Sequence, residues 1–190
     1  MATYTASSTR ARREPEPMST TEAVTIREAE LSDAVAIGQV HVESWRWAYR
    51  GHLPDETLDS LDPAAREQQW RSTMSDPSAS VLVAIDRGAV VGFASTGPAD
   101  AEDAAPGNAH LFAIYLVPAA AGRGIGRALL ERAEEVMRDA GFTRATLWVL
   151  ETNGRARRFY EQAGWTWDGT RSSHQVQCSN LPIVRYVRSL

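Results

Sequence analysis

The sequence of 190 residues contains no lysine, so all 20 of its basic residues are arginine. Its single cysteine, Cys178, excludes an internal disulfide and a cysteine-rich metal site. The four histidines have no zinc-ligand spacing, and we expect no bound metal. No apolar run approaches the roughly 18 residues of a membrane-spanning helix. The formal net charge of −4 argues against a general nucleic-acid or membrane surface. These absences predict a soluble, cytoplasmic protein that binds neither nucleic acid nor a membrane.

The first 22 residues differ in composition from the rest of the sequence. They are rich in Ser, Thr, Ala and Pro, and they lack the apolar core of a signal peptide. The composition predicts a disordered N-terminal tail over 1–22; a transit peptide is the alternative. Residues 23–190 contain no internal repeat, and we expect them to form one domain.

Apolar periodicity over 23–190 predicts an α/β (α+β) protein. Ser32 is the expected N-cap of the first long helix. The turn Asp86-Arg87-Gly88 joins two apolar runs and predicts a hairpin, and a polar loop follows at 97–108. The expected strands are 24–27, 81–85, 89–95, 110–117, 143–150, 165–170 and 183–188, and the expected helices are 32–50, 55–61, 63–75, 125–140 and 154–163.

The most informative stretch is the turn Gly122-Arg123-Gly124-Ile125-Gly126, between a predicted strand and a predicted helix. Such a turn directs unpaired N–H groups outward at a helix start, where the helix dipole favours an anion such as a phosphate. A Walker A motif is excluded because Arg127 and Ala128, not Lys and Ser or Thr, follow the last glycine. The spacing also differs from the dinucleotide fingerprint G-x-G-x-x-G. A plain tight connection remains the alternative for the turn alone.

Aromatic residues gather in the first helical region, at Trp45, Trp47, Tyr49, His52 and Trp70. Core packing accounts for most of them. Trp45 and Tyr49 are also candidates for lining a substrate pocket, since aromatic side chains commonly line small-molecule sites.

Several spaced motifs together resemble the GNAT superfamily of acyl-CoA-dependent N-acetyltransferases. The likeness follows the element order over about 24–190 and is sharpest over 110–168. It rests on Leu116-Val117-Pro118-Ala119-Ala120-Ala121-Gly122-Arg123-Gly124-Ile125-Gly126, Asn153-Gly154-Arg155-Ala156, Phe159-Tyr160-Glu161 and Gly164-Trp165. The resemblance implies a GNAT fold: a mixed central sheet of about six or seven strands, flanked by about four helices. It also implies a splay between the central parallel strands 110–117 and 143–150.

The resemblance implies that acetyl-CoA, or another acyl-CoA, binds in this splay as co-substrate. Its pantetheine arm would pair with main chain near Ile114, Leu116 and Val117, like an added strand. Asn153 matches a second family contact, although a plain helix cap is the alternative. Arg155, Arg158 or the neighbouring Arg157 would reach the phosphates. The diphosphate would rest on the N–H groups of Gly122, Arg123, Gly124, Ile125, Gly126 and Arg127.

One position departs from the family pattern. Ala121 stands where Arg or Gln is usual. Because the expected phosphate donors are main-chain groups, we expect cofactor binding to persist in weaker form, with the charge of Arg123 as a compensation.

Acyl transfer to an amine needs a base, an oxyanion donor and an acid. By resemblance, Tyr160 is the general acid that protonates the departing thiolate, and the N–H of Leu116 is the oxyanion donor. His110 occupies the place where many relatives carry a catalytic Glu, and it titrates near neutrality; a merely satisfied histidine is the alternative. Strand alternation puts His110 on the face of Phe112, Ile114 and Leu116. Glu43 and His41 are weaker base candidates, and a covalent route through Cys178 has little support.

The sequence therefore predicts an N-acetyltransferase that acts on the amine of a small molecule by direct attack. Acetylation of a protein or peptide amine and a non-catalytic acyl-CoA-binding module are the alternatives. Dimers are frequent among such proteins, so a homodimer is a further expectation. The identity of the acceptor amine is left open by the sequence.

Overall fold

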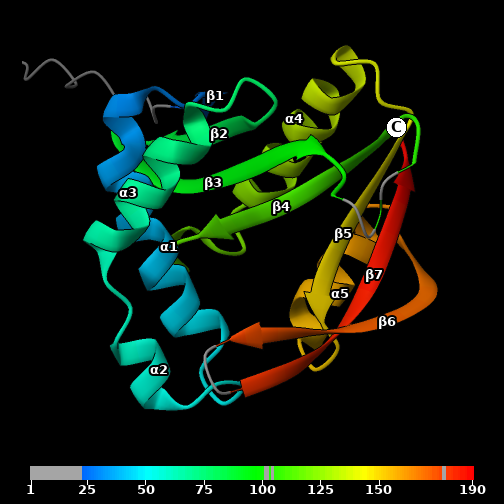
Figure 1. Ribbon diagram of the computed structural model, residues 1–190. Helices are drawn as coiled ribbons and strands as arrows, with labels where there is room; N and C mark the ends of the chain where they lie inside the picture. The colour runs from blue at the N-terminus through cyan, green and yellow to red at the C-terminus, as the bar shows by residue number, and fades with distance from the viewer. Residues whose placement is uncertain (1–22, 101–102, 104, 177–178) are drawn as a thin grey trace, which may run out of the picture.

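The computed structural model describes residues 23–100, 103, 105–176 and 179–190. The predicted tail 1–22 and Cys178 lie outside these residues. In the described part, seven strands form one sheet in the order β1-β2-β3-β4-β5-β7-β6, accompanied by five α-helices (Figure 1). The strands are β1 (Thr25–Glu28), β2 (Ser80–Asp86), β3 (Ala89–Pro98), β4 (Asn108–Leu116), β5 (Arg144–Leu150), β6 (Thr166–Val176) and β7 (Ser179–Ser189). The α-helices are α1 (Ala34–Ala48), α2 (Asp55–Asp59), α3 (Pro63–Met74), α4 (Ile125–Asp139) and α5 (Gly154–Gln162).

Two apolar cores lie on opposite faces of the sheet. On one face, Ile125, Leu129 and Ala133 of α4 pack on strand residues such as Leu147, and Tyr160 of α5 joins the same core. On the other face, α1 and α3 pack on β2, β3 and β4. Figure 1 shows this layering, with α1 and α3 on one side of the sheet and α4 and α5 on the other. None of the helices in the described residues has the length and apolar character to cross a membrane.

The start of the first long helix differs from the prediction. Ser32 does not cap α1; it lies inside a short 3₁₀ turn, Leu31–Asp33. Asp33 accepts a hydrogen bond from the Glu30 N–H at 2.7 Å and forms an ion pair with Arg27 at 2.7 Å. A carboxylate satisfies both partners, which the Ser32 hydroxyl cannot do.

The central parallel strands splay apart. β4 and β5 pair only at three positions, where Asn108, Ala109 and His110 face Arg144, Ala145 and Thr146. Every other neighbouring pair in the sheet of the described residues is antiparallel. The main-chain edges of the last six residues of β4 and the last four of β5 are therefore left open between the strands, as the predicted splay requires.

A bulge in β4 changes which side chains share a face. Ala113 pairs with Ser95 and Leu111 with Thr96, so Phe112 is an extra residue without a partner in β3. Ala109 and Leu111 consequently pack in the α4 core, whereas Ala113 packs in the α1 core. The prediction that His110 shares a face with Ile114 and Leu116 is wrong, because one inserted residue reverses the alternation.

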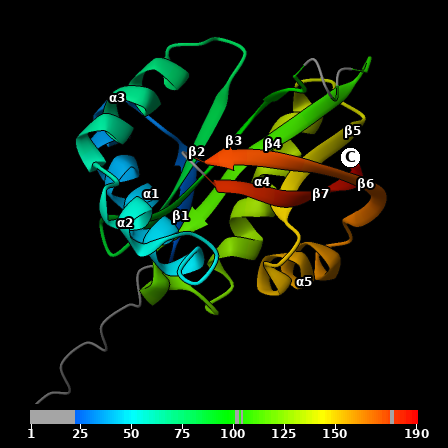
Figure 2. The same ribbon diagram turned by 60° about the horizontal axis from the view of Figure 1, so that its bottom comes forward.

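The last two strands are longer than the sequence indicated. β6 continues to Val176 and β7 begins at Ser179, whereas the expected strands were 165–170 and 183–188. The extension of β6 consists of mostly exposed, mostly polar residues that give no apolar alternation. Figure 2 shows this hairpin crossing in front of β4 and β5 toward α1 and α2.

Candidate active site

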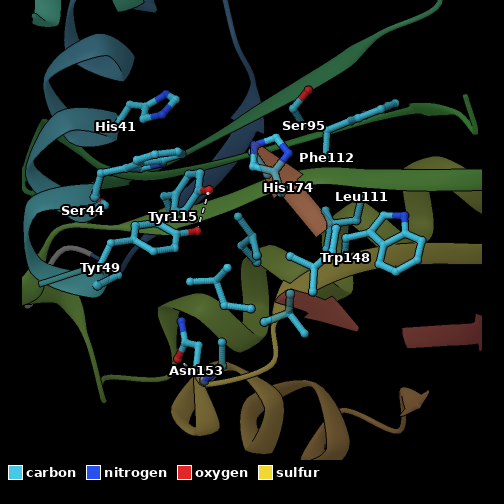
Figure 3. Close-up of a pocket in the computed structure, with 18 of the residues that line it drawn as sticks. His41, Ser44, Tyr49, Ser95, Leu111, Phe112, Tyr115, Trp148, Asn153 and His174 are labelled. Atoms are coloured by element: carbon cyan, nitrogen blue, oxygen red, sulfur yellow. Dashed lines mark hydrogen bonds between the residues drawn. The ribbon is translucent and has the colours of Figure 1, made fainter. Parts of the chain in front are cut away.

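A cavity of about 1550 Å³ occupies the splay (Figure 3). All four histidines of the sequence line it. The lining residues fall into two groups, named here for the roles that the resemblance implies. The cofactor end consists of Gly122, Gly124, Gly126, Arg127 and the start of α5, Asn153–Arg158 without Arg157. The acceptor end consists of His41, Trp45, Ser95, His110, Phe112, Tyr115, Trp148 and His174.

The glycine turn presents main chain to the cofactor end. Gly122 and Gly124 have φ of 76° and 81°, values that L-residues with side chains rarely adopt. Space around both glycines is open where a Cβ would stand. Gly124 is the N-cap of α4, and the first intrahelical bond runs from Ala128 N–H to Gly124 O at 3.1 Å. The N–H groups of Ile125, Gly126 and Arg127 therefore have no partner within the helix, which is the arrangement that suits an anion.

The arginine side chains of the turn point elsewhere. Arg123 forms an ion pair with Asp86 at 2.6 Å, and Arg127 binds Glu131 at 2.6 Å and the Gln162 carbonyl at 3.0 Å. Neither Arg123 nor Ile125 lines the cavity, and Ile125 belongs to the core. The charge of Arg123 is balanced by Asp86, so it gives little compensation for Ala121.

The edge of β4 supplies further main-chain groups. Val117 N–H donates to Val91 O at 2.9 Å, and the Val117 carbonyl accepts from Ala120 N–H at 3.0 Å. Both groups of Val117 are thus engaged, and Val117 does not line the cavity. Because bonded and non-bonded pairs alternate along an antiparallel ladder, Ile114 and Leu116 direct their N–H groups into the splay. The Ser44 hydroxyl donates to Leu116 O at 2.8 Å, so the carbonyl group of Leu116 is engaged.

The start of α5 combines a helix cap with cationic side chains. Asn153 Oδ1 accepts from Ala156 N–H at 3.0 Å, so the cap expected as one alternative is present. The Arg155 guanidinium lies 4.1 Å from the centre of the Trp47 ring. Arg157 donates to the Tyr186 hydroxyl and the Glu151 carbonyl, each at 3.1 Å, and is thereby turned away from the cavity. Arg158 lines the cavity and has no ion pair among the described residues.

Tyr160 of α5 lines the cavity. It is buried, and its burial raises the pKa of the phenol above the ordinary 10.0, with a further contribution from Tyr115. Tyr115 in turn lies beside Tyr49, with 3.4 Å between the two hydroxyl oxygens. Tyr160 therefore keeps its proton at neutral pH, as a proton donor must.

The tautomer of His110 follows from its neighbours. The Thr146 hydroxyl donates to the Ala109 carbonyl at 3.2 Å, so it accepts from His110 Nδ1–H at 2.9 Å. The other nitrogen, Nε2, then carries the lone pair. Asp103 Oδ2 lies 3.8 Å from Nδ1. Burial lowers the pKa of His110 below its ordinary 6.5, while the charges of Asp100 and Asp103 oppose this shift. The imidazole is therefore unprotonated at neutral pH.

The remaining candidates from the sequence are Trp45, Tyr49, His41 and Glu43. Trp45 and Tyr49 line the cavity with their rings 4.7 Å apart. His41 accepts a hydrogen bond from Trp70 Nε1 at 3.0 Å, and burial lowers the pKa of His41 to about 3. Such a histidine is too weak a base for neutral pH. Glu43 is exposed and does not line the cavity.

Sequence reasoning missed several residues of the acceptor end. Phe112, Trp148 and His174 line it, and Figure 3 labels all three. Asp103 is the buried partner of Arg185, and it accepts from Trp148 Nε1 at 2.9 Å. It falls in the polar loop 97–108, where nothing in the sequence distinguishes it from neighbouring acidic residues.

Comparisons with known proteins identify the family and the fold of the chain. Residues 40–165 match the model of the acetyltransferase (GNAT) family. The uncharacterized N-acetyltransferase YuaI of Bacillus subtilis is 40% identical over 131 residues, 68% of this chain and 73% of that protein. A spermidine N(1)-acetyltransferase of Thermoplasma acidophilum is 28% identical over 153 residues, 79% of this chain and 92% of that protein. The crystal structure of the PaiA N-acetyltransferase of T. acidophilum, in complex with coenzyme A, has a TM-score of 0.69 at 22% identity and covers 88% of this chain and 99% of that chain. The predicted family and fold are confirmed.

Proposed function

Because the chain belongs to the GNAT acetyltransferase family, we propose that it transfers the acetyl group of acetyl-CoA to the primary amine of a small molecule. One observation carries this proposal. A single cavity of about 1550 Å³ joins the glycine turn to both Tyr160 and His110, so donor and acceptor can meet between a proton donor and a proton acceptor.

The cofactor end suits coenzyme A in shape and charge. Its anion site consists of main-chain N–H groups. Of its lining arginines, Arg127 is paired with Glu131, so Arg155 and Arg158 supply the positive charge. The open edge of β4 at Ile114 offers main-chain pairing to the pantetheine arm. These features support binding of acetyl-CoA with the diphosphate on the turn and the thioester beside Leu116.

The proposed chemistry assigns one step to each of three groups. An alkylamine of pKa about 10.4 needs roughly 4–5 kcal/mol to lose its proton at pH 7, so a base is useful. His110 Nε2 accepts this proton, directly or through water, as the amine nitrogen bonds to the thioester carbon. The Leu116 N–H donates to the carbonyl oxygen as negative charge develops there. Tyr160 then gives its proton to the sulfur as the carbon–sulfur bond breaks. The nitrogen loses a second proton to become an amide, and this proton restores the Tyr160 hydroxyl.

Part of the cavity is covered by the hairpin of β6 and β7, and this cover favours a small-molecule acceptor over a protein surface. The hairpin of β6 and β7 contributes Ser172–Val176, Leu181 and Ile183 to the lining. His52 Nδ1 and Thr152 Oγ1, 3.0 Å apart, link the loop after α1 to the loop after β5. The relative that acetylates spermidine, by its name, also acts on a small amine.

A thiol-release assay with acetyl-CoA tests the proposal. The panel contains small primary amines, peptides with free N-termini and peptides with a lysine side chain, and the acetylated product is identified by mass. Turnover with small amines is the expected result. Turnover with peptides alone would show that the acceptor is a protein or peptide amine. Binding of coenzyme A without any turnover would favour the non-catalytic acyl-CoA-binding module.

The pH profile tests the base separately. Since the pKa of His110 lies below 6.5, kcat/KM should stay high at neutral pH and fall on the acid side of that value. His110→Gln should remove this acid limb and lower kcat by about 100-fold. If kcat/KM of the variant still falls at acid pH as in the wild type, His110 is excluded as the base.

A further inference from the structure

An exposed aromatic ring lies beside the proposed base. Phe112 is 50% exposed, which is unusual for a phenylalanine in a central strand, and it lines the cavity. The bulge explains the exposure, because Phe112 has no partner in β3 and packs in neither core. Its ring centre lies 4.7 Å from that of His110, and a Cβ on Gly97 would come within 3.4 Å of the Phe112 ring. The ring is therefore held against β3 with one surface free.

A second aromatic residue flanks His110 from the other strand of the splay. Trp148 follows Thr146 by two residues on β5, so the two side chains share a face, and Thr146 holds the His110 ring. Asp103 Oδ2 fixes the indole at 2.9 Å from Trp148 Nε1 and lies 3.8 Å from His110 Nδ1. Figure 3 shows Phe112 and Trp148 at the same end of the cavity. His110 therefore has one aromatic ring in contact and a second held near it through Asp103.

Charge at this end of the cavity is sparse. The carboxylates of the lining are Asp76 and Asp100, both exposed, and Asp76 is engaged by the Ser78 hydroxyl at 2.7 Å. Buried Asp103 is outside the lining and is already paired with Arg185. The Arg66 guanidinium adds a positive charge to the lining, over the Trp45 ring. Among the described residues, no buried carboxylate is left for a second ammonium group of a polycationic acceptor.

We propose that Phe112 and Trp148 form the specificity pocket for the acceptor, and that the acceptor is a primary amine joined by a short linker to an aromatic ring. The ring packs on the free surface of Phe112 while the amine reaches His110 Nε2. Burial of two apolar surfaces gives the affinity, and an edge-to-face or offset contact gives the orientation. This inference rests on the proposed amine acetylation.

Three primary amines distinguish the outcomes: 2-phenylethylamine, 2-cyclohexylethylamine and 1,4-diaminobutane. The wild-type protein should show a kcat/KM for the phenyl amine at least about tenfold above that for the diamine, with the cyclohexyl amine between them. Phe112→Ala should raise KM for the phenyl amine by about tenfold with little change in kcat. KM for the diamine and for acetyl-CoA should not change.

Trp167→Ala is the matched control, since Trp167 is 40% exposed and lies outside the cavity lining. It should leave all these constants unchanged. Preference for the diamine, or an equal effect of Phe112→Ala on all three amines, would overturn this inference alone. Failure to acetylate any amine would overturn the proposed function together with it.

Discussion

At the cofactor end of the cavity the groups that face a ligand are main-chain N–H groups, whereas at the acceptor end they are side chains. The turn around Gly122 and Gly124 works through its backbone, and its arginine side chains pair with Asp86 and Glu131. At the acceptor end, His110 depends on Thr146 and Trp148 depends on Asp103. A main-chain site tolerates changes such as Ala121, because its donors belong to the fold. A side-chain site changes with each residue that holds it.

The largest effect is expected at Tyr160, the proposed proton donor. Tyr160→Phe removes the proton donor and keeps the ring, so kcat should fall by about 100-fold or more. The affinity for acetyl-CoA should not change, since the cofactor end does not rely on this hydroxyl. Steady-state thiol release and calorimetric titration measure the two quantities. An unchanged kcat would remove Tyr160 from the mechanism.

The acceptor end should also give the protein an acid-sensitive stability. Burial lowers the pKa of His41 to about 3, against 6.5 in the unfolded chain. Between these values the unfolded chain binds a proton that the folded protein does not bind. The contribution of His41 is therefore fully present above pH 6.5 and is lost as the pH falls toward 3.

His41→Gln tests this contribution, because glutamine keeps an acceptor for Trp70 Nε1 and cannot titrate. Denaturant unfolding at about pH 6.5 and about pH 4.5 gives the measurement. The wild type should lose roughly 2 kcal/mol more than the variant over this interval. Equal losses in both proteins would show that His41 is protonated in the folded state.

A side chain that covers the N–H groups of the glycine turn should weaken the binding of acetyl-CoA at the cofactor end. A Cβ at Gly126 would stand 3.2 Å from Leu116 Cδ1, and the branches of a valine would extend over the N–H groups of the turn. Gly126→Val should raise the Kd for acetyl-CoA by at least about tenfold. Ala128→Val is the control, since Ala128 is exposed near the start of the same helix and does not line the cavity. Similar losses in both variants would argue against a diphosphate at the turn.

The smallest effect is expected at Ala121, where the cofactor end lacks the Arg or Gln side chain that is usual in the family. Ala121→Gln restores a residue usual in the family at a position that lines the cavity. It should lower the Kd for acetyl-CoA by about threefold, the contribution of one exposed hydrogen bond. A tenfold or larger gain, roughly the upper limit for such a bond, would show that the N–H groups alone are insufficient.

Local patterns were enough to predict the family, the order of the elements and the anion-binding turn. Glycines at 122 and 124 indicate a backbone that only glycine adopts readily, and both have positive φ. Asn153 as a cap and Tyr160 on the following helix are likewise features of one short stretch. The predicted roles of Tyr160 and His110 remain predictions until the variants are measured.

The acceptor end was decided by the tertiary structure. His110 and its partner Thr146 are 36 residues apart in the chain, and Trp148 and its partner Asp103 are 45 apart. Hydrogen bonds between such distant residues leave no periodic signal in the sequence. The bulge at Phe112 depends on a register with β3 and cannot be read from β4 alone. The sequence by itself determined the backbone conformation of the glycine turn, because that conformation follows from neighbouring residues. The arrangement of side chains at the acceptor end required the folded chain, which brings distant residues together.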